Sequence, residues 1–373
     1  MDASYAFTVG IGMSFLRFVP ETGSFKPKSD DKIGMYWYGF ISVLLLGLVL
    51  TIGAFIFYRR QWSEGAIVRQ VLENVTIVLF GFFITFGVLE FYFKVFFAQT
   101  DGYTFTLAAR NWHEKYWYPI NSLGYRDWEW IPESGIGKTK VIVVGDSFVA
   151  GTGIKDHEDR FSNQLAKLLG QDYVVFNVAS PGWSTQDEIK ALVAYPYKPN
   201  ILILSYFVND IEQTVYDQGI ERPEFIRRPT GVWGFIVDNS YAFNFLYWRW
   251  YRLTQPPPKP TYLEWINSLY RDPKLWWLHR QELLTIIEGA ASEQIPLLVV
   301  VFPNLAAIEE SQFISQPVID LFQEHNVPVL DVSMLLAGHD PAEITVNAVD
   351  AHPNEAVHLE VAEHLYQMIQ DIR

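Results

Sequence analysis

A glycine-aspartate-serine turn follows the first strand-like run of the chain. The residues Gly145-Asp146-Ser147 come directly after an apolar run at 140–144. Ligands of doubly wound sheets bind at the carboxyl ends of the strands, so Ser147 is expected where chemistry occurs. A serine hydroxyl becomes an effective nucleophile only when a base removes its proton. If Ser147 is a nucleophile, the chain must supply such a base.

The sequence Asp-Ala-His-Pro-Asn at 350–354 supplies one. Residues two apart in an extended backbone point the same way, so Asp350 can bond one ring nitrogen of His352. The other nitrogen is then free to accept the proton of Ser147. Taken singly, these signals also fit a serine that caps a helix and a histidine with a structural role.

Acyl transfer further needs donors aimed at the developing oxyanion, and the next two strand-like runs end in suitable groups. Gly182 follows the second run, and a glycine lets a backbone N–H approach a ligand closely. Asn209 follows the third run and carries a side-chain amide. With the N–H of Ser147, these groups make three candidate oxyanion donors.

The pattern resembles the four sequence blocks of the SGNH, or GDSL, hydrolases, in the same order. The resemblance covers about residues 140–210 and 295–370. Its blocks are GDSFVAG at 145–151, the glycine of SPGWST at 180–185, VND at 208–210 and DAHPN at 350–354.

The resemblance implies a flavodoxin-like three-layer α/β/α fold with a central parallel sheet, and hydrolysis or transfer of an acyl ester. It makes Ser147 the nucleophile, Asp350 and His352 the rest of the triad, and Ser147, Gly182 and Asn209 the oxyanion hole. It implies no cofactor.

The chain departs from the family pattern at two places. Phenylalanine replaces the usual leucine of the first block, and Phe207 stands two residues before Asn209, where glycine is usual. The second change puts the substrate specificity in question more than the chemistry. The stretch NSLGYR at 121–126 resembles a lead-in of membrane-anchored or exported members, and it equally fits an ordinary turn.

Short β-branched runs alternate with helical patterns from Lys140 onward, which predicts a parallel sheet covered by helices. The segment 159–170 has an apolar helical face and ends at Gly170, and the last helix is expected to begin at Pro353. The predicted strands are 140–144, 173–179, 201–208, 296–302 and 328–333.

Composition narrows the function further. The 373 residues include no cysteine, which excludes disulfides and a thiolate nucleophile, and no His/Asp/Glu cluster has metal-ligand spacing. Residues 1–100 carry 8 Lys/Arg against 7 Asp/Glu, whereas residues 101–373 carry 20 against 35. Such an acidic domain argues against nucleic acid as a partner, and it fits simple solubility.

Two apolar segments predict transmembrane helices. Residues 33–58 carry no charge and are long enough to cross a bilayer. Residues 75–97 are also apolar but contain Glu90 and Lys94, four apart on one helix face, where they can pair. A long amphipathic surface helix is the alternative for this second segment.

The chain is therefore expected to divide into four parts, with two spans placing both ends on one side of the membrane. The Lys/Arg counts beside the spans do not settle the orientation. Family analogy favours an extracytoplasmic, periplasmic-type location for the catalytic domain. The four parts are an interfacial segment 1–32, two transmembrane helices within 33–98, a connecting segment 99–139 and a hydrolase-like domain 140–373.

An aromatic-rich insert at 211–290 interrupts the α/β alternation. It fits a lid, a platform for sugar rings, a surface lying on the bilayer, or additional packing of an enlarged domain. Two functions stay open. One is a membrane-anchored O-acyl ester hydrolase or acyltransferase acting on a glycan or lipid ester. The other is an assembly subunit of a membrane complex, which would dock a partner through the insert.

Overall fold

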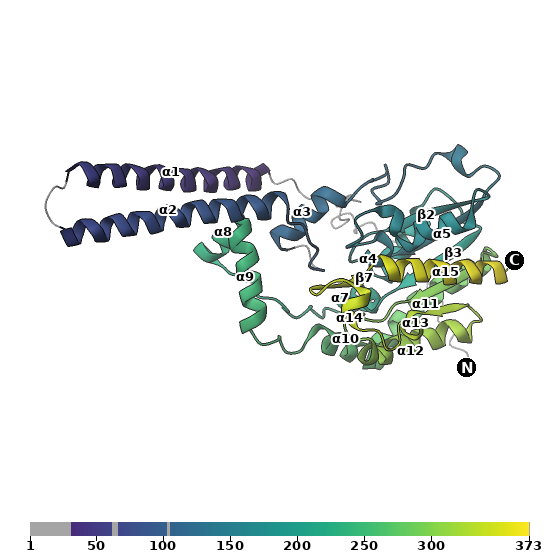
Figure 1. Cartoon of the computed structure of the whole chain (residues 1–373). Coiled ribbons are helices and arrows are strands. Elements are labelled where there is room, and N and C mark those ends of the chain that lie inside the picture. Colours follow the sequence, from purple (N-terminus) through teal and green to yellow (C-terminus); the bar gives the residue numbers. More distant parts are fainter. Residues whose placement is uncertain (1–30, 62–65, 103–104, 373) are drawn as a thin grey trace, which may run out of the picture.

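The computed structural model describes residues 31–61, 66–102 and 105–372. The expected interfacial segment 1–32 therefore lies outside the described residues, apart from the two residues that begin the first helix. The architecture consists of two long antiparallel helices that extend from one end of an α/β domain (Figure 1).

The two long helices correspond to the predicted spans. Helix α1 comprises Asp31–Gln61 and helix α2 comprises Ala66–Val95. Their segments Trp37–Arg60 and Ile67–Val95 have mean hydropathies of 2.7 and 2.0, and both are long and apolar enough to cross a membrane. Helix α2 begins nine residues before the predicted position 75, and within this added part the side chains of Arg69 and Glu73 pair one turn apart at 3.1 Å.

A five-stranded parallel sheet forms the centre of the α/β domain, in the order β2-β1-β3-β4-β5. This is the strand order of flavodoxin-like folds, so the predicted fold class is confirmed. Every predicted strand segment overlaps one of the five, and β1 is one residue longer at each end than predicted. Their bounds are β1 (Thr139–Gly145), β2 (Tyr173–Ala179), β3 (Ile201–Tyr206), β4 (Leu297–Val301) and β5 (Val329–Asp331).

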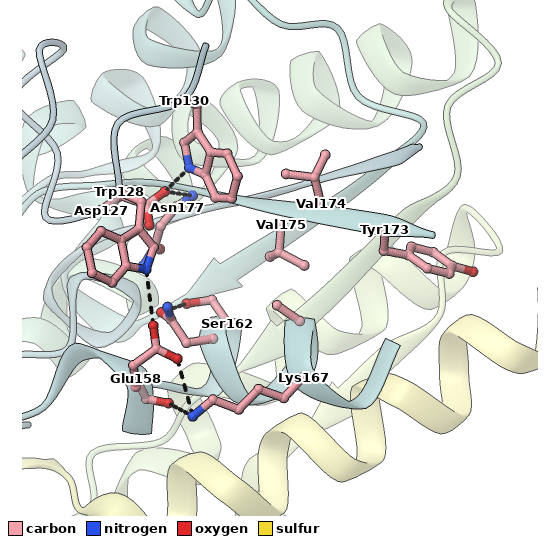
Figure 2. Close-up of a pocket in the computed structure, with 12 residues that line it drawn as sticks. Asp127, Trp128, Trp130, Glu158, Ser162, Lys167, Tyr173, Val174, Val175 and Asn177 are labelled. Atoms are coloured by element: carbon pink, nitrogen blue, oxygen red, sulfur yellow. Dashed lines mark hydrogen bonds and ion pairs between the residues drawn. The ribbon is translucent and has the colours of Figure 1, made fainter. Parts of the chain in front are cut away.

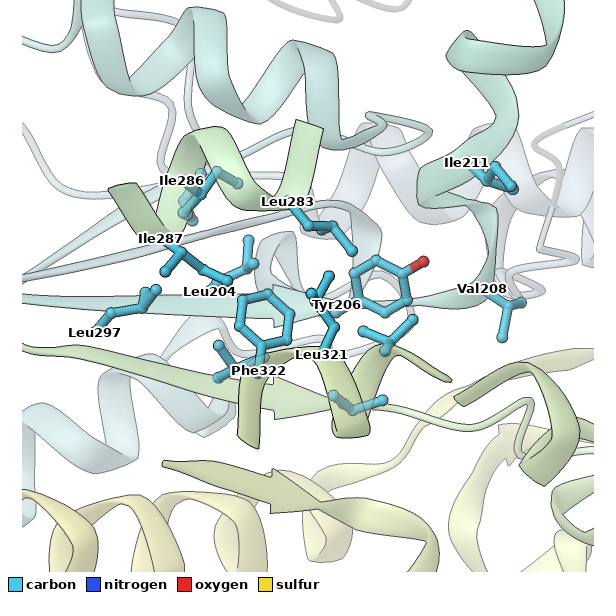
Figure 3. Packing of buried hydrophobic residues seen from close by; sticks show 14 of the residues in the cluster. Leu204, Tyr206, Val208, Ile211, Leu283, Ile286, Ile287, Leu297, Leu321 and Phe322 are labelled. Atoms are coloured by element: carbon cyan, nitrogen blue, oxygen red, sulfur yellow. The ribbon is translucent and has the colours of Figure 1, made fainter. Parts of the chain in front are cut away.

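Two apolar cores lie on the two faces of this sheet, because successive side chains of a strand point to opposite faces. In β1, Ile142 and Val144 join one core, while Val141 and Val143 join the other. Figure 3 shows the first core, in which Leu204 and Tyr206 of β3 meet the covering helices. That core is covered by α6 (Thr185–Ala194), α10 (Tyr262–Arg271), α11 (Pro273–Ser292) and α12 (Ile308–Glu324).

The opposite core is covered by α5 (Phe161–Leu169) and α15 (Glu355–Asp371). Helix α5 ends at Gly170, as predicted, with a φ of 79° that favours glycine. The prediction that the last helix begins at Pro353 was wrong. Asn354 caps that helix by accepting a hydrogen bond from the Val357 N–H, so Pro353 stays in the preceding strand.

The remaining elements connect the spans, the sheet and the insert. They are α3 (Leu107–Tyr116), α4 (Ser147–Ala150), α7 (Glu212–Asp217), α8 (Gly231–Asn239), α9 (Tyr241–Thr254), α13 (Val332–Leu335), α14 (Pro341–Ile344), and the antiparallel pair β6 (Thr345–Asn347) and β7 (Asp350–Pro353). Short 3₁₀ turns occupy Pro132–Gly135, His157–Asp159 and Val208–Ile211.

The aromatic insert 211–290 packs against two different parts of the chain. Helices α10 and α11 pack into the sheet core, as the packing interpretation expects. Helices α8 and α9 instead lie beside the spans, where α8 contacts α1 and α9 contacts α2 (Figure 1). There Phe86 and Phe93 of α2 form a small apolar cluster with Tyr241 and Ala242 of α9.

Glu90 fastens α9 to the spans. Its fully buried carboxylate accepts hydrogen bonds from the Trp37 indole (3.0 Å) and the Ser240 hydroxyl (2.8 Å). It also accepts from the backbone N–H groups of Tyr241 and Ala242, both at 2.9 Å. These N–H groups belong to the first turn of α9, whose positive dipole end favours a carboxylate. The expected pairing of Glu90 with Lys94 is replaced by these bonds, and Lys94 donates to the Tyr241 hydroxyl.

Replacing Glu90 should loosen this junction. Glu90→Ala would leave three buried donors and the half-buried Trp37 indole without their acceptor, at a cost of about 2–4 kcal/mol. We expect a clearly lower Tm in detergent and faster tryptic cleavage within α9. The control Glu73→Ala removes only a helix-surface ion pair, worth about 0.5 kcal/mol. Equal effects of the two variants would contradict the role of Glu90 at this junction.

Candidate active site

Ser147 lies at the sharp turn between β1 and α4, at the end of the α/β domain that faces the spans (Figure 1). Asp146 caps α4 by accepting from the Phe148 N–H at 2.9 Å. Gly145 is required at this turn, since a Cβ there would lie 2.5 Å from Val149 Cγ2 and 3.0 Å from the Ser205 carbonyl oxygen. The turn therefore holds the Ser147 side chain at the carboxyl edge of the sheet.

His352 and Asp350 reach this serine from β7. The distance between His352 Nε2 and Ser147 Oγ is 2.8 Å. On the other side of the ring, His352 Nδ1 is hydrogen-bonded to Asp350 Oδ1, as two residues on one side of a strand allow. The structure thus brings the three residues singled out in the sequence into one hydrogen-bonded chain. A carboxylate can only accept, so Nδ1 carries the proton and Nε2 is free to accept from the hydroxyl.

Burial and charge shift the pKa values of His352 and Asp350 in opposite directions. Burial would lower the pKa of His352, but the charge and hydrogen bond of Asp350 outweigh it, so the pKa lies above 6.5. Burial would likewise raise the pKa of Asp350, but the positive charge of His352 and its hydrogen bonds hold it below 3.8. Asp350 is therefore ionised near neutral pH and makes the imidazole a stronger base.

The two other sequence-predicted residues lie on neighbouring turns. Gly182 has a φ of 78° and faces open space where a side chain would stand. The amide of Asn209 donates to the Trp183 carbonyl at 3.2 Å, which ties the turn after β3 to the turn after β2. The same amide also lies beside the Asp146 carboxyl and acts to lower the pKa of that group.

Phe207, the departure from the family pattern, packs beside the serine turn. Its ring stacks on that of Phe148 with a centroid distance of 4.2 Å. Phe148 in turn lies 5.1 Å from the His352 ring. The bulky residue therefore supports the residue next to Ser147 and helps to set the position of the imidazole.

The segment that follows α2 contacts the site, a feature the sequence did not indicate. The carbonyl oxygen of Thr100 accepts from the Asn347 amide at 3.2 Å, and the Thr100 side chain helps to lower the pKa of Asp350. Gly102 has a φ of 74°, and a Cβ on it would lie 3.5 Å from Asp350 Oδ1. The carboxylate is thus held by the chain just beyond the second span.

Arg126, the last residue of the NSLGYR stretch, braces the loop after α4. Its buried guanidinium donates to the carbonyl oxygens of Gly151 (2.7 Å) and Ile154 (2.8 Å). Burial is the main reason why the pKa of Arg126 falls to about 9. The stretch is therefore more than a turn, because it supplies a buried cation that fixes the end of the serine block.

Three buried carboxyl groups lie behind the serine turn, and the sequence analysis did not identify them as a group. Burial raises the pKa of Asp146 to about 6, and it raises the pKa values of Glu188 and Asp210 well above the ordinary range. The negative charge of Asp146 acts in the same direction on both Glu188 and Asp210. Burial therefore favours the neutral forms of Glu188 and Asp210.

A separate hollow of about 260 Å³ lies on the outer side of edge strand β2, and none of the predicted site residues lines it (Figure 2). Its rim is braced by two tryptophans, since the Trp128 indole donates to Glu158 and the Trp130 indole to Asp127. Its polar side chains are thus largely bonded to one another, and we assign it no role in the chemistry.

A doubly wound sheet with Ser147 and His352 in contact at its carboxyl edge defines an enzyme of the ester-hydrolase class. The chain belongs to the GDSL-like lipase/acylhydrolase family, whose model matches residues 143–359, more than half of its length. The family resemblance drawn from the four sequence blocks is confirmed. A search of the curated proteins finds no match.

Solved structures similar to this chain come from bacterial members of the same class. A lipolytic protein of the G-D-S-L family from Desulfitobacterium hafniense DCB-2 is 16% identical over 62% of this chain and 99% of its own (TM-score 0.39). The esterase EstA from Pseudoalteromonas sp. is 12% identical over 63% and 98% (0.37). A lipase/acylhydrolase from Enterococcus faecalis is 14% identical over 62% and 96% (0.38).

The His352–Asp350 pair predicts a measurable titration. By ¹H–¹⁵N NMR of the ¹⁵N-histidine-labelled chain, the His352 imidazole should titrate above pH 6.5. Asp350→Asn removes the opposing charge, so the same resonance should then titrate below its wild-type position. The control is Asp172→Asn. Asp172 directly precedes β2, at the far end of the sheet, so this change should leave the titration of His352 unchanged. An unshifted resonance in Asp350→Asn would contradict the pairing.

Proposed function

We propose that this chain is a membrane-anchored serine O-acyl ester hydrolase. The observation that carries the proposal is the 2.8 Å contact of His352 Nε2 with Ser147 Oγ, combined with Asp350 on the opposite ring nitrogen. As Ser147 Oγ bonds to the ester carbonyl carbon, its proton passes to His352 Nε2. The same proton then goes to the departing alcohol, which leaves an acyl group on Ser147.

The oxyanion formed in this step is held by the backbone N–H groups of Ser147 and Gly182 and by the Asn209 amide. The contact of Asn209 with the Trp183 carbonyl supports this role, because it orients the amide over the sheet edge. Donors fixed before the reaction stabilise the developing charge without reorganisation. His352 next removes a proton from water as the water oxygen bonds to the acyl carbon. The bond from that carbon to Ser147 Oγ then breaks, the proton passes from His352 to Oγ, and the carboxylic acid leaves.

The substrate is an acyl ester of a glycan or a lipid. If another hydroxyl replaces water in the second step, the same residues perform acyl transfer instead of hydrolysis. Helices α1 and α2 anchor the enzyme in the bilayer, and the α/β domain lies outside the cytoplasm. Screening acyl chain lengths with and without an acceptor alcohol separates these outcomes.

The triad is tested by the turnover of p-nitrophenyl acetate by the purified full chain. Ser147→Ala and His352→Ala should each lose roughly 10⁴-fold or more, and the double variant should be little worse than either. Asp350→Asn should lose as much or less, and Asn209→Ala roughly 10²–10³-fold. The exposed Ser292→Ala and His364→Ala are matched controls that should keep wild-type rates. Unchanged turnover in Ser147→Ala would rule out the proposed nucleophile.

The orientation is tested by cysteine accessibility, since the native chain has no cysteine. Gly65→Cys lies between the two spans and should not react with an impermeant thiol reagent in intact cells. Val193→Cys, at a position of α6 that is 84% exposed, should react. The reverse pattern would place the α/β domain in the cytoplasm.

A further inference from the structure

Helix α9 carries an apolar stripe on the side that faces away from the protein. Tyr241, Ala242 and Trp248 are buried against the rest of the chain. Leu246, Trp250 and Leu253 are 50%, 53% and 82% exposed. Their spacing of four and three residues places them on one face of the helix. One face of α9 is already packed against the protein. Its second apolar face therefore needs another apolar surface to cover it.

Helix α8 extends this outward face. Val232 and Trp233 are 75% and 66% exposed, while Val237 on the opposite side is buried. Helices α8 and α9 are joined by Ser240, whose hydroxyl is held by Glu90. We refer to residues 231–254 as the interfacial hairpin. It is continuous with the spans, because its inner face packs on α1 and α2.

The polar residues near the ends of the two spans indicate the depth of the interfacial hairpin in the membrane. In α2, Arg69 and Glu90 are 21 residues apart, which is about 31 Å along a helix. In α1, Trp37 and Arg59 are 22 residues apart, or about 33 Å. Both separations match a hydrocarbon core of about 30 Å. Trp37 and Glu90, which are hydrogen-bonded to each other, therefore lie at the headgroup boundary, and α9 begins there.

The charge of this segment is opposite to that of the domain. Residues 231–254 contain two arginines and one acidic residue, Asp238, whereas residues 101–373 as a whole contain 20 Lys/Arg and 35 Asp/Glu. Arg249 is exposed beside the apolar stripe, with its guanidinium 5.8 Å from the Phe245 ring centre. Tryptophan and arginine together on an exposed helix favour the boundary of an anionic bilayer.

We propose that the interfacial hairpin is a third membrane element, which lies in the plane of the bilayer and binds its anionic headgroup and upper acyl region. Its inner face is locked to the spans by Glu90, and its outer face is covered by lipid. The proposal rests on the membrane anchoring in the proposed function and is independent of the ester chemistry. Together with the contact of Thr100 to Asp350, the hairpin fixes the catalytic domain at one orientation to the membrane.

Site-directed spin labelling of the full chain tests this directly, because every introduced cysteine is unique. The chain is reconstituted singly into nanodiscs of phosphatidylcholine and phosphatidylglycerol at a 3:1 ratio. Nitroxides are placed by Leu253→Cys and Trp250→Cys in the hairpin, Val78→Cys in the middle of α2, and Val193→Cys in α6. All four native side chains are at least half exposed, so the substitutions spare the core. Accessibility to oxygen, which partitions into lipid, is compared with accessibility to a water-soluble nickel chelate.

The oxygen-to-nickel ratio at 250 and 253 should be several-fold higher than at 193 and should approach that at 78. Replacing phosphatidylglycerol by phosphatidylcholine, or adding Arg249→Gln, should lower the ratio at 253. Nickel accessibility at 253 equal to that at 193, with position 78 still in lipid, would overturn the proposal and leave the anchoring intact. Shielding of 253 from both reagents would overturn it in favour of a protein contact. Nickel accessibility at 78 would instead refute the anchoring itself.

Discussion

The buried carboxylate of Asp350 connects the chemistry of this chain to its long helices. On one side it is hydrogen-bonded to His352, which lies 2.8 Å from Ser147. On the other side it meets Thr100 and Gly102, in the segment that leaves α2. The segment after α2 covers this buried carboxylate and so keeps water away from the pair that Asp350 makes with His352.

Glu90 applies the same constraint at the opposite end of that segment. It is a second buried carboxylate, and it is satisfied only when α1, α2 and α9 meet around it. Only twelve residues separate Glu90 from Gly102, which lies beside Asp350. The long helices and the Ser147 site therefore meet through one short segment of chain.

The fold and much of the site were predictable from sequence because their signals are local. Buried parallel strands appear as continuous apolar runs, and a glycine-aspartate-serine turn after the first of them places Ser147 at the sheet edge. Asp350 and His352 are two residues apart on one strand, so their pairing can also be predicted from a short stretch of sequence. The predicted start of the last helix at Pro353 was wrong because the Asn354 side chain caps the helix, so that Glu355 is its first residue.

The long-range contacts left no comparable signal. Glu90 looked like the partner of Lys94 because they are one helical turn apart, but its actual donors include groups 150 to 152 residues away. The carboxyl groups of Asp146, Glu188 and Asp210 come from three separate elements, and only the folded sheet brings them together. The insert looked like one unit by composition, yet α10 and α11 complete the core while α8 and α9 contact the spans.

The most direct test of the account is covalent labelling of the full chain with a fluorophosphonate, followed by peptide mapping of the modified residue. The account predicts one stoichiometric adduct on Ser147, lost in Ser147→Ala and strongly slowed in His352→Ala because the hydroxyl then lacks its base. Labelling at a different serine, or no labelling while a known family member reacts under the same conditions, would contradict it. Ser147 would then be only a helix cap, and Asp350 and His352 a structural pair.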